Sequence, residues 1–194
     1  MKSVKIGLTV LLWLVVLGLV YKLYTVVNDP VQFKVALKVR STATQNRLLD
    51  IKVAQEYYRE KNNTYATNFD DLINTVKNDK LTIIKTMGDE DDTTVVVTYD
   101  TILVPIIDEI ISKERFRGTE DVNQLRYIPL TESKSFTLAM DTITLQRVKL
   151  AVFQAKATKD DYLDGLDKSF IKNPAIEDLS IGSLTSASGK GSWE

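Results

Sequence analysis

The side chains with the greatest scope for chemistry in this 194-residue chain are clustered carboxylates. One acidic run is Gly88-Asp89-Glu90-Asp91-Asp92, and Asp100 stands at the twelfth position counted from Asp89. Calcium requires several oxygen ligands in a flexible loop, so this run is a candidate calcium loop. The glycine of an EF-hand is missing, however, and β-branched runs flank the segment. We therefore favour a solvated acidic hairpin turn.

A second set of carboxylates comprises Asp160, Asp161 and Asp164, together with Asp108 and Glu109. Glycoside hydrolysis needs two carboxylates held across a cleft, often with the pKa of one of them raised by burial. Proximity in the sequence does not provide that arrangement. A carboxylate-dependent envelope hydrolase is therefore the least favoured interpretation.

The chain contains no cysteine and no histidine. This composition excludes disulfides, cysteine-bound zinc and thiolate nucleophiles, and it removes the usual general base near neutral pH. Catalysis by a serine-histidine-aspartate or cysteine-histidine arrangement within this chain is also excluded. We expect a non-enzymatic protein with no catalytic residue, no cofactor and no metal. A net charge of −1 gives no reason to expect a nucleic-acid partner.

After a short N-terminal tail (1–5), residues 6–27 form an apolar run with a single charge, Lys22. As a helix this run would span about 33 Å, enough for a hydrocarbon core of about 30 Å. The run ends in TVVNDP (25–30), which lacks the small-x-small pattern of a signal-peptide cleavage site. We therefore predict an uncleaved single-pass anchor in the cytoplasmic (inner) membrane. Its anchoring residues are Leu8, Leu11, Leu12, Trp13, Leu14, Val15, Leu17 and Leu19.

Basic residues flank this run on both sides, so the positive-inside rule does not fix its orientation. Lys2 and Lys5 precede the run, and five basic residues follow it within a short stretch: Lys34, Lys38, Arg40, Arg47 and Lys52. That series either contacts anionic lipid or forms a solvated helix face, and we favour the solvated face.

The pattern downstream predicts helices first. Asn28-Asp29-Pro30 should bend or interrupt the helix that leaves the membrane, because proline lacks a backbone donor. Residues 28–47 then read as a juxtamembrane helical linker, in which the polar stretch 40–47 is a candidate flexible joint. Helical spacing continues to Asn62-Asn63, a typical helix stop. A second helix is predicted over 68–79, with Asn68 as its N-cap.

Beyond residue 80 the pattern changes to β-branched runs of strand length. The predicted strands are 81–87, 93–99, 101–106, 125–130, 134–140, 141–146 and 148–157. A short helix or turn follows at 159–170, and the serine- and glycine-rich tail 183–194 should be loosely held. Because the strands do not alternate with crossover helices, we predict an α+β soluble domain over 48–182, with one mainly antiparallel sheet packed on the long helix.

Apolar residues recur along the end of the long helix and into the segment after it. They are Leu48, Ile51, Ala54, Tyr57, Tyr58, Tyr65, Phe69 and Leu72. Such a face either packs between helix and sheet or contacts another subunit. We favour packing because of the apolar area that these side chains bury.

The order of Tyr57 or Tyr58, Asn62-Asn63, Tyr65 and Leu72 resembles the helix end of type IV pilins and major pseudopilins. In that family an amphipathic helix ends near a tyrosine, and an antiparallel sheet packs on it. The N-terminus is similar only in part. Gly7 precedes an apolar helix, but Leu12 stands where pilin precursors typically have glutamate.

The whole chain also resembles uncharacterised single-pass membrane proteins of Bacteroidetes-type bacteria. The likeness rests on Asp100-Thr101-Ile102-Leu103-Val104-Pro105 and on the stretch from Ser183-Leu184-Thr185 to Trp193-Glu194. This family supplies no activity, but it favours a periplasmic soluble domain.

These observations predict a membrane-anchored structural or assembly subunit of a bacterial envelope complex. Its expected partners are membrane lipid and other envelope subunits, in a homo- or hetero-oligomer. The alternative is an accessory subunit that docks on a larger membrane or secretion complex without polymerising.

Overall fold

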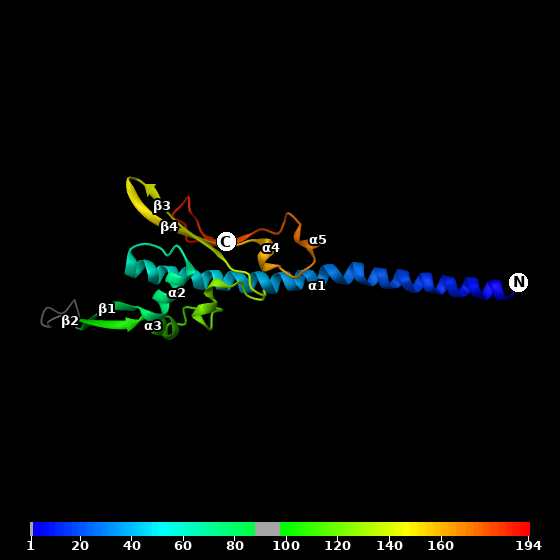
Figure 1. Cartoon of the computed structure of the whole chain (residues 1–194), viewed down its shortest axis with the longest axis horizontal. Coiled ribbons are helices and arrows are strands. Elements are labelled where there is room, and N and C mark those ends of the chain that lie inside the picture. The colour runs from blue at the N-terminus through cyan, green and yellow to red at the C-terminus, as the bar shows by residue number, and fades with distance from the viewer. Residues whose placement is uncertain (1, 88–97) are drawn as a thin grey trace.

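A single long helix forms the axis of the molecule. The computed structural model describes residues 2–87 and 98–194. Helix α1 (Lys2–Asn62) projects from the rest of the chain for about half of its length, and every other element gathers around its C-terminal half (Figure 1). The architecture is α+β with antiparallel strand pairing, as the sequence predicts.

Helix α1 continues through two places where we expected an interruption. Pro30 lies inside the helix, and residues 40–47 are helical throughout. An interior proline costs about 3 kcal/mol. The helix nevertheless continues without a break on both sides of Pro30. The polar stretch is not a joint, because Thr44 and Arg47 are buried against the domain.

The helix ends where the sequence predicts. Asn63 adopts a left-handed backbone (φ 56°), and its N–H donates to the Arg59 carbonyl at 2.8 Å. After a short turn, helix α2 (Phe69–Asn78) begins with Asn68 as its N-cap, whose side chain accepts from the Asp71 N–H at 2.8 Å. The predicted cap and stop are both confirmed.

One group of elements covers one side of α1. Strands β1 (Lys80–Met87) and β2 (Thr98–Pro105) pair in antiparallel fashion, and helix α3 (Ile106–Ser112) follows directly. The predicted strand 101–106 therefore stops one residue early, and α3 was not predicted. Of the predicted strand 93–99, residues 93–97 lie outside the described part of the chain.

A 3₁₀-helix, η1 (Val122–Arg126), replaces the first part of the predicted strand 125–130. Asp121 caps η1 by accepting from the Asn123 N–H, and Pro129 has no N–H to offer to a strand ladder. Only Tyr127 keeps a strand-like contact, an isolated bridge to Ser135.

The other side of α1 carries a three-stranded antiparallel sheet in the order β3-β4-β5. Strand β3 (Thr137–Leu145) merges two predicted strands, and β4 (Val148–Ala157) has the predicted bounds. Two single-turn helices follow, α4 (Lys159–Tyr162) and α5 (Lys168–Ile171). Strand β5 (Leu179–Gly182) was not predicted.

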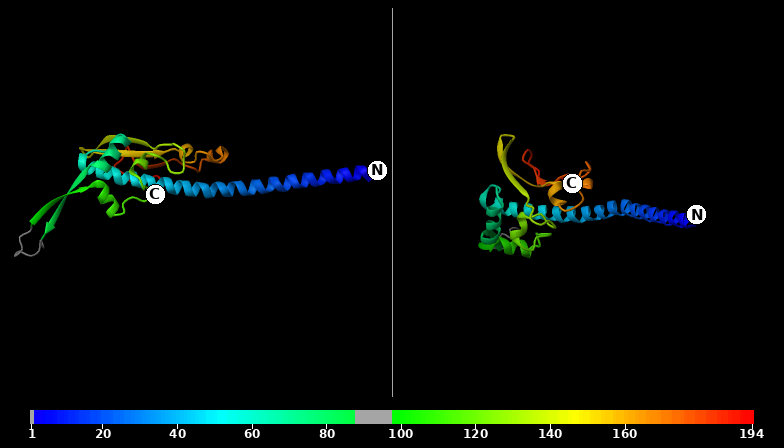
Figure 2. Two further views of the ribbon diagram at one scale, coloured as in Figure 1. Left: turned by 60° about the horizontal axis from the view of Figure 1, so that its bottom comes forward. Right: turned by 45° about the vertical axis from the view of Figure 1, so that its right-hand side comes forward.

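The structure thus has two sheets where we predicted one. They lie on opposite sides of α1, with β1 and β2 on one side and β3, β4 and β5 on the other (Figures 1 and 2). The buried residues of α1 occupy about half of the helix circumference, and a face of this width can hold elements along both of its edges. The core runs along the helix end and includes Leu48, Ile51, Ala54, Leu72, Leu125 and Ile181.

The segment 183–194 also differs from expectation, because it makes regular contacts with the domain. Ser192 donates its N–H to the Ser180 carbonyl at 2.8 Å, and Gly191 bridges to Ile181. Trp193 packs against the edge of the core.

Gly182 ends β5 with φ +78°, and a Cβ there would overlap the Phe153 carbonyl. We expect Gly182→Ala to lower the free energy of unfolding by about 3 kcal/mol or more, since backbone strain and overpacking add. Gly165→Ala is the matched control: φ is +82°, but no atom lies within 4 Å, so about 1 to 2 kcal/mol is expected. Chemical denaturation of the detergent-solubilised chain measures both. Equal losses of unfolding free energy in the two variants would contradict the expected overlap between a Cβ at position 182 and the Phe153 carbonyl.

Candidate functional site

The projecting part of α1 is the first candidate functional surface. Among the described residues, α1 contains the one stretch that is long and apolar enough to cross a membrane, and none of that stretch is buried. Leu11, Leu12, Trp13, Leu14, Val15, Leu17 and Leu19 are all exposed, while the side chain of Leu8 is outside the described set. These features are compatible with a single-pass anchor.

An uncovered apolar stripe continues past this stretch on α1. We define the valine stripe as Val31, Val35 and Val39, which are 54%, 57% and 54% exposed. At roughly 100° per residue, these three side chains fall within about 80° of the helix circumference. Phe33 and Leu37 lie roughly opposite, where they pack against the domain. One side of this part of α1 therefore holds the domain, and the other side offers apolar side chains to solvent.

The residues predicted to pack or to contact a subunit come together around the end of α1. Leu48, Ile51, Ala54, Tyr57, Tyr65, Phe69 and Leu72 are buried in the core, and Tyr58 is half-buried against it. The Tyr65 and Phe153 rings pack at 4.7 Å between centroids, while Arg59 donates to the Tyr65 hydroxyl at 2.8 Å. This aromatic contact joins the turn after α1 to β4.

A buried carboxylate that sequence reasoning missed ties α1 to a loop. Asp50 is fully buried and accepts three hydrogen bonds, from the Arg117 N–H (2.6 Å), the Gly118 N–H (2.9 Å) and the Thr119 hydroxyl (2.6 Å). An ionised carboxylate is stable in such a place only when its oxygens are satisfied in this way.

Two further buried polar side chains of α1, Arg47 and Gln55, also form hydrogen bonds with the backbone of neighbouring segments. Arg47 donates to the carbonyls of Gln124 (2.6 Å) and Gly118 (3.0 Å). Burial lowers the pKa of its guanidinium, and the nearby Asp50 opposes this shift. Gln55 makes a double hydrogen bond with the backbone N–H and C=O of Ala66. The signal in the sequence was the helical spacing that places these polar residues beside Leu48, Ile51 and Ala54.

The basic residues that follow the apolar run do not share one environment. Lys34 and Lys38 are exposed as expected, whereas Arg47 is buried. Arg40 donates to the backbone carbonyls of Asp164 (2.5 Å) and Tyr162 (3.4 Å). The interpretation as one solvated face is wrong for these two arginines, because loop carbonyls attract them to the domain.

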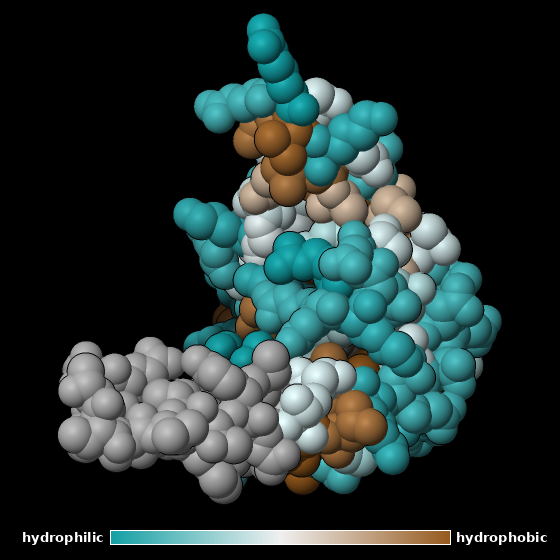
Figure 3. All heavy atoms as spheres, turned by 90° about the vertical axis from the view of Figure 1, so that its left-hand side faces the viewer, coloured by the Kyte–Doolittle hydropathy of each residue, from teal (hydrophilic) through white to brown (hydrophobic). Residues whose placement is uncertain are grey.

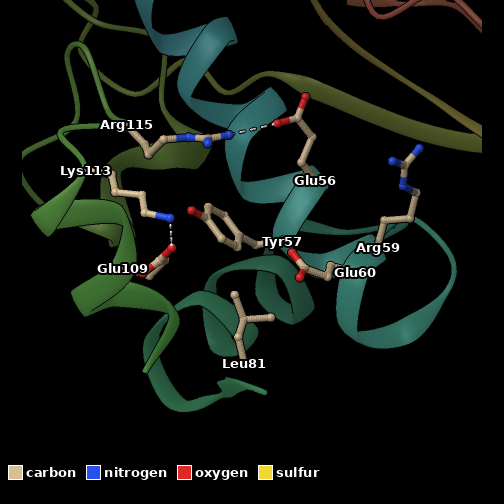
Figure 4. Close-up of a pocket in the computed structure, with 8 residues that line it drawn as sticks. All are labelled: Glu56, Tyr57, Arg59, Glu60, Leu81, Glu109, Lys113 and Arg115. Atoms are coloured by element: carbon tan, nitrogen blue, oxygen red, sulfur yellow. Dashed lines mark hydrogen bonds and ion pairs between the residues drawn. The ribbon is translucent and has the colours of Figure 1, made fainter. Parts of the chain in front are cut away.

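A pocket of about 540 Å³ opens where the end of α1 meets α3 (Figure 4). Its lining carries equal numbers of acidic and basic groups above Leu81. They are Glu56, Arg59, Glu60, Glu109, Lys113 and Arg115, with Tyr57 between them. Most are paired: Arg115 with Glu56 at 3.3 Å, and Lys113 with Glu109.

An aromatic ring lies among the charged groups of this pocket. Arg115 also lies over the Tyr57 ring, 5.6 Å from its centroid. Burial raises the pKa of the Tyr57 hydroxyl, and the hydrogen bond to Glu109 raises that of Lys113. Both groups therefore keep their protons to higher pH than usual. The Arg115–Glu56 pair is exposed on both side chains, whereas Glu109 is largely shielded from solvent in its pair with Lys113.

The other carboxylate candidates do not form a site. The acidic run 88–92 lies outside the described residues, as does the side chain of Asp100. Asp108 and Glu109 lie on α3, on the other side of α1 from Asp160, Asp161 and Asp164 (Figure 1). Within 2–87 and 98–194, no group of three acidic side chains could hold a metal ion.

No protein-family model matches the chain, and searches of the curated proteins and of the solved structures returned no match.

We expect Asp50→Ala to lower the free energy of unfolding by about 3 kcal/mol or more, because three buried donors lose their acceptor. Asp108→Ala is the control: this carboxylate is exposed and makes no hydrogen bond or ion pair in the described structure, so a change within about 0.5 kcal/mol is expected. Denaturant titration followed by circular dichroism measures both. A small loss at Asp50 would mean that the loop 117–119 does not depend on it.

Proposed function

We propose that this protein is a membrane-anchored, non-enzymatic assembly subunit of a bacterial envelope complex, whose copies associate through α1. The observation that carries the proposal is the valine stripe. It is apolar, exposed and opposite the side that holds the domain.

Length supports this proposal. An apolar surface from residue 6 to residue 39 would cover about 51 Å of helix, far more than a bilayer core of about 30 Å. Asp29, Lys34 and Lys38 also interrupt the downstream part with charge. The stripe therefore lies outside the hydrocarbon, where water disfavours exposed valines. Another helix laid along it would bury them.

The topology that we propose has the N-terminus inside and the domain in the periplasm, anchored in the inner membrane. The order of residues shared with pilins and pseudopilins supports a pilin-like role, as do a long N-terminal helix and antiparallel strands packed on its end.

The charged pocket supports a second candidate, an accessory subunit that docks on a larger membrane or secretion complex. Its Arg115–Glu56 pair is exposed and its lining is neutral overall, so the charged side chains of another protein would suit it.

Because the chain has no cysteine, Val35→Cys places a single thiol on the stripe. We expect mild oxidation of intact cells to give a disulfide-linked dimer of this variant, since paired stripes bring the two thiols together. Lys34→Cys is the control. It is also exposed to solvent but is turned by roughly 100° around the helix, and should give at least fivefold less dimer. Equal dimer from both variants, or none from Val35→Cys, would contradict association through the stripe.

Orientation is tested by a reporter that is active only in the periplasm, fused after Glu194. We expect activity, because the proposed topology exports the domain that carries the C-terminus. The same reporter fused before Met1 is the control and should be inactive. The reverse pattern would place the domain in the cytoplasm.

A further inference from the structure

The pocket between α1 and α3 contains a buried hydroxyl without a hydrogen-bond partner. Tyr57 is only 6% exposed, and within the described residues its hydroxyl makes no hydrogen bond. The ring belongs to the core at the end of α1, and Figure 4 shows its hydroxyl directed toward Lys113. Buried tyrosine hydroxyls usually have a partner. This hydroxyl is therefore available to a ligand that enters the pocket.

Two cationic side chains beside this hydroxyl come from the end of α3. Glu114 has a left-handed backbone (φ 47°), and the Arg115 N–H donates to the Ile110 carbonyl at 3.0 Å. This conformation is uncommon for a residue other than glycine. It reverses the chain just after α3, so that Lys113 and Arg115 both line the same pocket.

These cations have hydrogen-bond donors to spare. A lysine carries three N–H donors and an arginine side chain carries five. In residues 2–87 and 98–194, Lys113 pairs with Glu109, and the Arg115 guanidinium makes one hydrogen bond, to Glu56 at 3.3 Å. Burial raises the pKa of the Tyr57 hydroxyl, which therefore stays protonated and able to donate. Together the three side chains can hold a carboxylate.

The opposite wall of the pocket, formed by α1, is acidic. Glu56 and Glu60 are four residues apart and so share one face of the helix. Glu60 is exposed and makes no hydrogen bond or ion pair in the part of the chain that the structure describes. Arg59 is held elsewhere, because it donates to the Tyr65 hydroxyl at 2.8 Å. Figure 4 shows its guanidinium directed away from the Tyr57 ring. This wall therefore suits an ammonium group.

The pocket thus has a cationic end and an anionic end on different elements. An anion alone would be repelled by the carboxylates, and a cation alone by Lys113 and Arg115. A ligand that carries both charges satisfies both ends. The volume of about 540 Å³ lies within the usual range for small-molecule sites, about 300 to 1,000 Å³. Leu81 adds an apolar contact at the bottom of the pocket.

The surroundings of this site suit a ligand that arrives from water. In the view toward the end of the domain where α1 finishes, hydrophilic side chains cover most of the surface (Figure 3). A charged small molecule therefore reaches this end of the domain without crossing a continuous apolar surface.

We propose that the pocket binds a short zwitterionic peptide with both termini free. Its carboxylate accepts hydrogen bonds from the Tyr57 hydroxyl, Lys113 and Arg115, and its ammonium group donates to Glu60. A side chain of the peptide lies over Leu81. This inference goes beyond the proposed assembly function and does not depend on it, because the valine stripe lies on another part of α1.

The test is equilibrium dialysis of the detergent-solubilised full chain against trialanine, its C-terminal amide and its N-acetyl form. We expect saturable binding of trialanine. The amide should bind at least tenfold more weakly, because it has no carboxylate for the three donors. The acetylated form should bind about threefold more weakly, since Glu60 is exposed to solvent. The proposal is overturned if trialanine does not saturate the chain at about 10 mM, or if the amide binds as well as trialanine.

Two substitutions assign the ends of the peptide. Tyr57→Phe removes the hydroxyl and keeps the ring, so it should weaken trialanine about tenfold and leave the amide unchanged. Glu60→Gln should weaken trialanine about threefold and leave the acetylated form unchanged. Asp108→Asn is the matched control: this exposed carboxylate on α3 lies outside the pocket lining, so no peptide should change in affinity.

Thermal unfolding separates binding from a structural role of Tyr57. Because its hydroxyl has no partner among the described residues, Tyr57→Phe should leave the unfolding midpoint unchanged. A lowered midpoint would show that the hydroxyl serves the fold, and would overturn the assignment. Equal weakening of trialanine and its amide by Tyr57→Phe would overturn it as well, because the hydroxyl would then not bind the carboxylate.

Discussion

The domain depends on the burial of the Asp50 carboxylate against the loop that follows α3. A helix that holds elements on several sides of its end needs more than apolar packing, which has no preferred direction. Asp50 and Arg47 reach the loop 117–119 and η1, and Gln55 reaches the turn at Ala66. These hydrogen bonds fix the position of each segment around the helix, so that two separate sheets can share one core.

Helix α1 therefore has three parts with different side-chain chemistry. Its first part is apolar all round, its middle part is apolar on one side and packed on the other, and its last part is buried with polar contacts among the aliphatic residues. The change from one part to the next is gradual along a continuous helix. An exposed apolar segment, the exposed valine stripe and the part that holds the domain thus follow one another in a fixed order along one axis.

Much of the fold could be predicted wherever a local signal decided the outcome. Asn68 caps α2 because its side chain satisfies a helix N–H, and β4 matches its β-branched and alternating pattern. Tertiary contacts decided the rest. Residues 40–47 are polar, yet they are helical because the domain binds Arg40 and Arg47. Residues 125–130 resemble a strand, but Asp121 and Pro129 favour a 3₁₀-helix and an irregular segment. Of the candidate surfaces, the apolar run was visible in the sequence. The buried contacts of Asp50, Arg47 and Gln55 were not, because they depend on which loops the fold brings to the end of α1.

The continuity of α1 through Pro30 has a mechanical consequence. An unbroken helix of 61 residues is a rod of about 90 Å, and it transmits rotation about its own axis as well as push and pull. A turn of the apolar segment would therefore rotate the domain by the same angle, with no hinge to absorb it. Inserting one residue between the apolar segment and the valine stripe would rotate the stripe, and the domain with it, by roughly 100° relative to the apolar segment. The exact residue count of α1 thus sets the direction in which the domain faces.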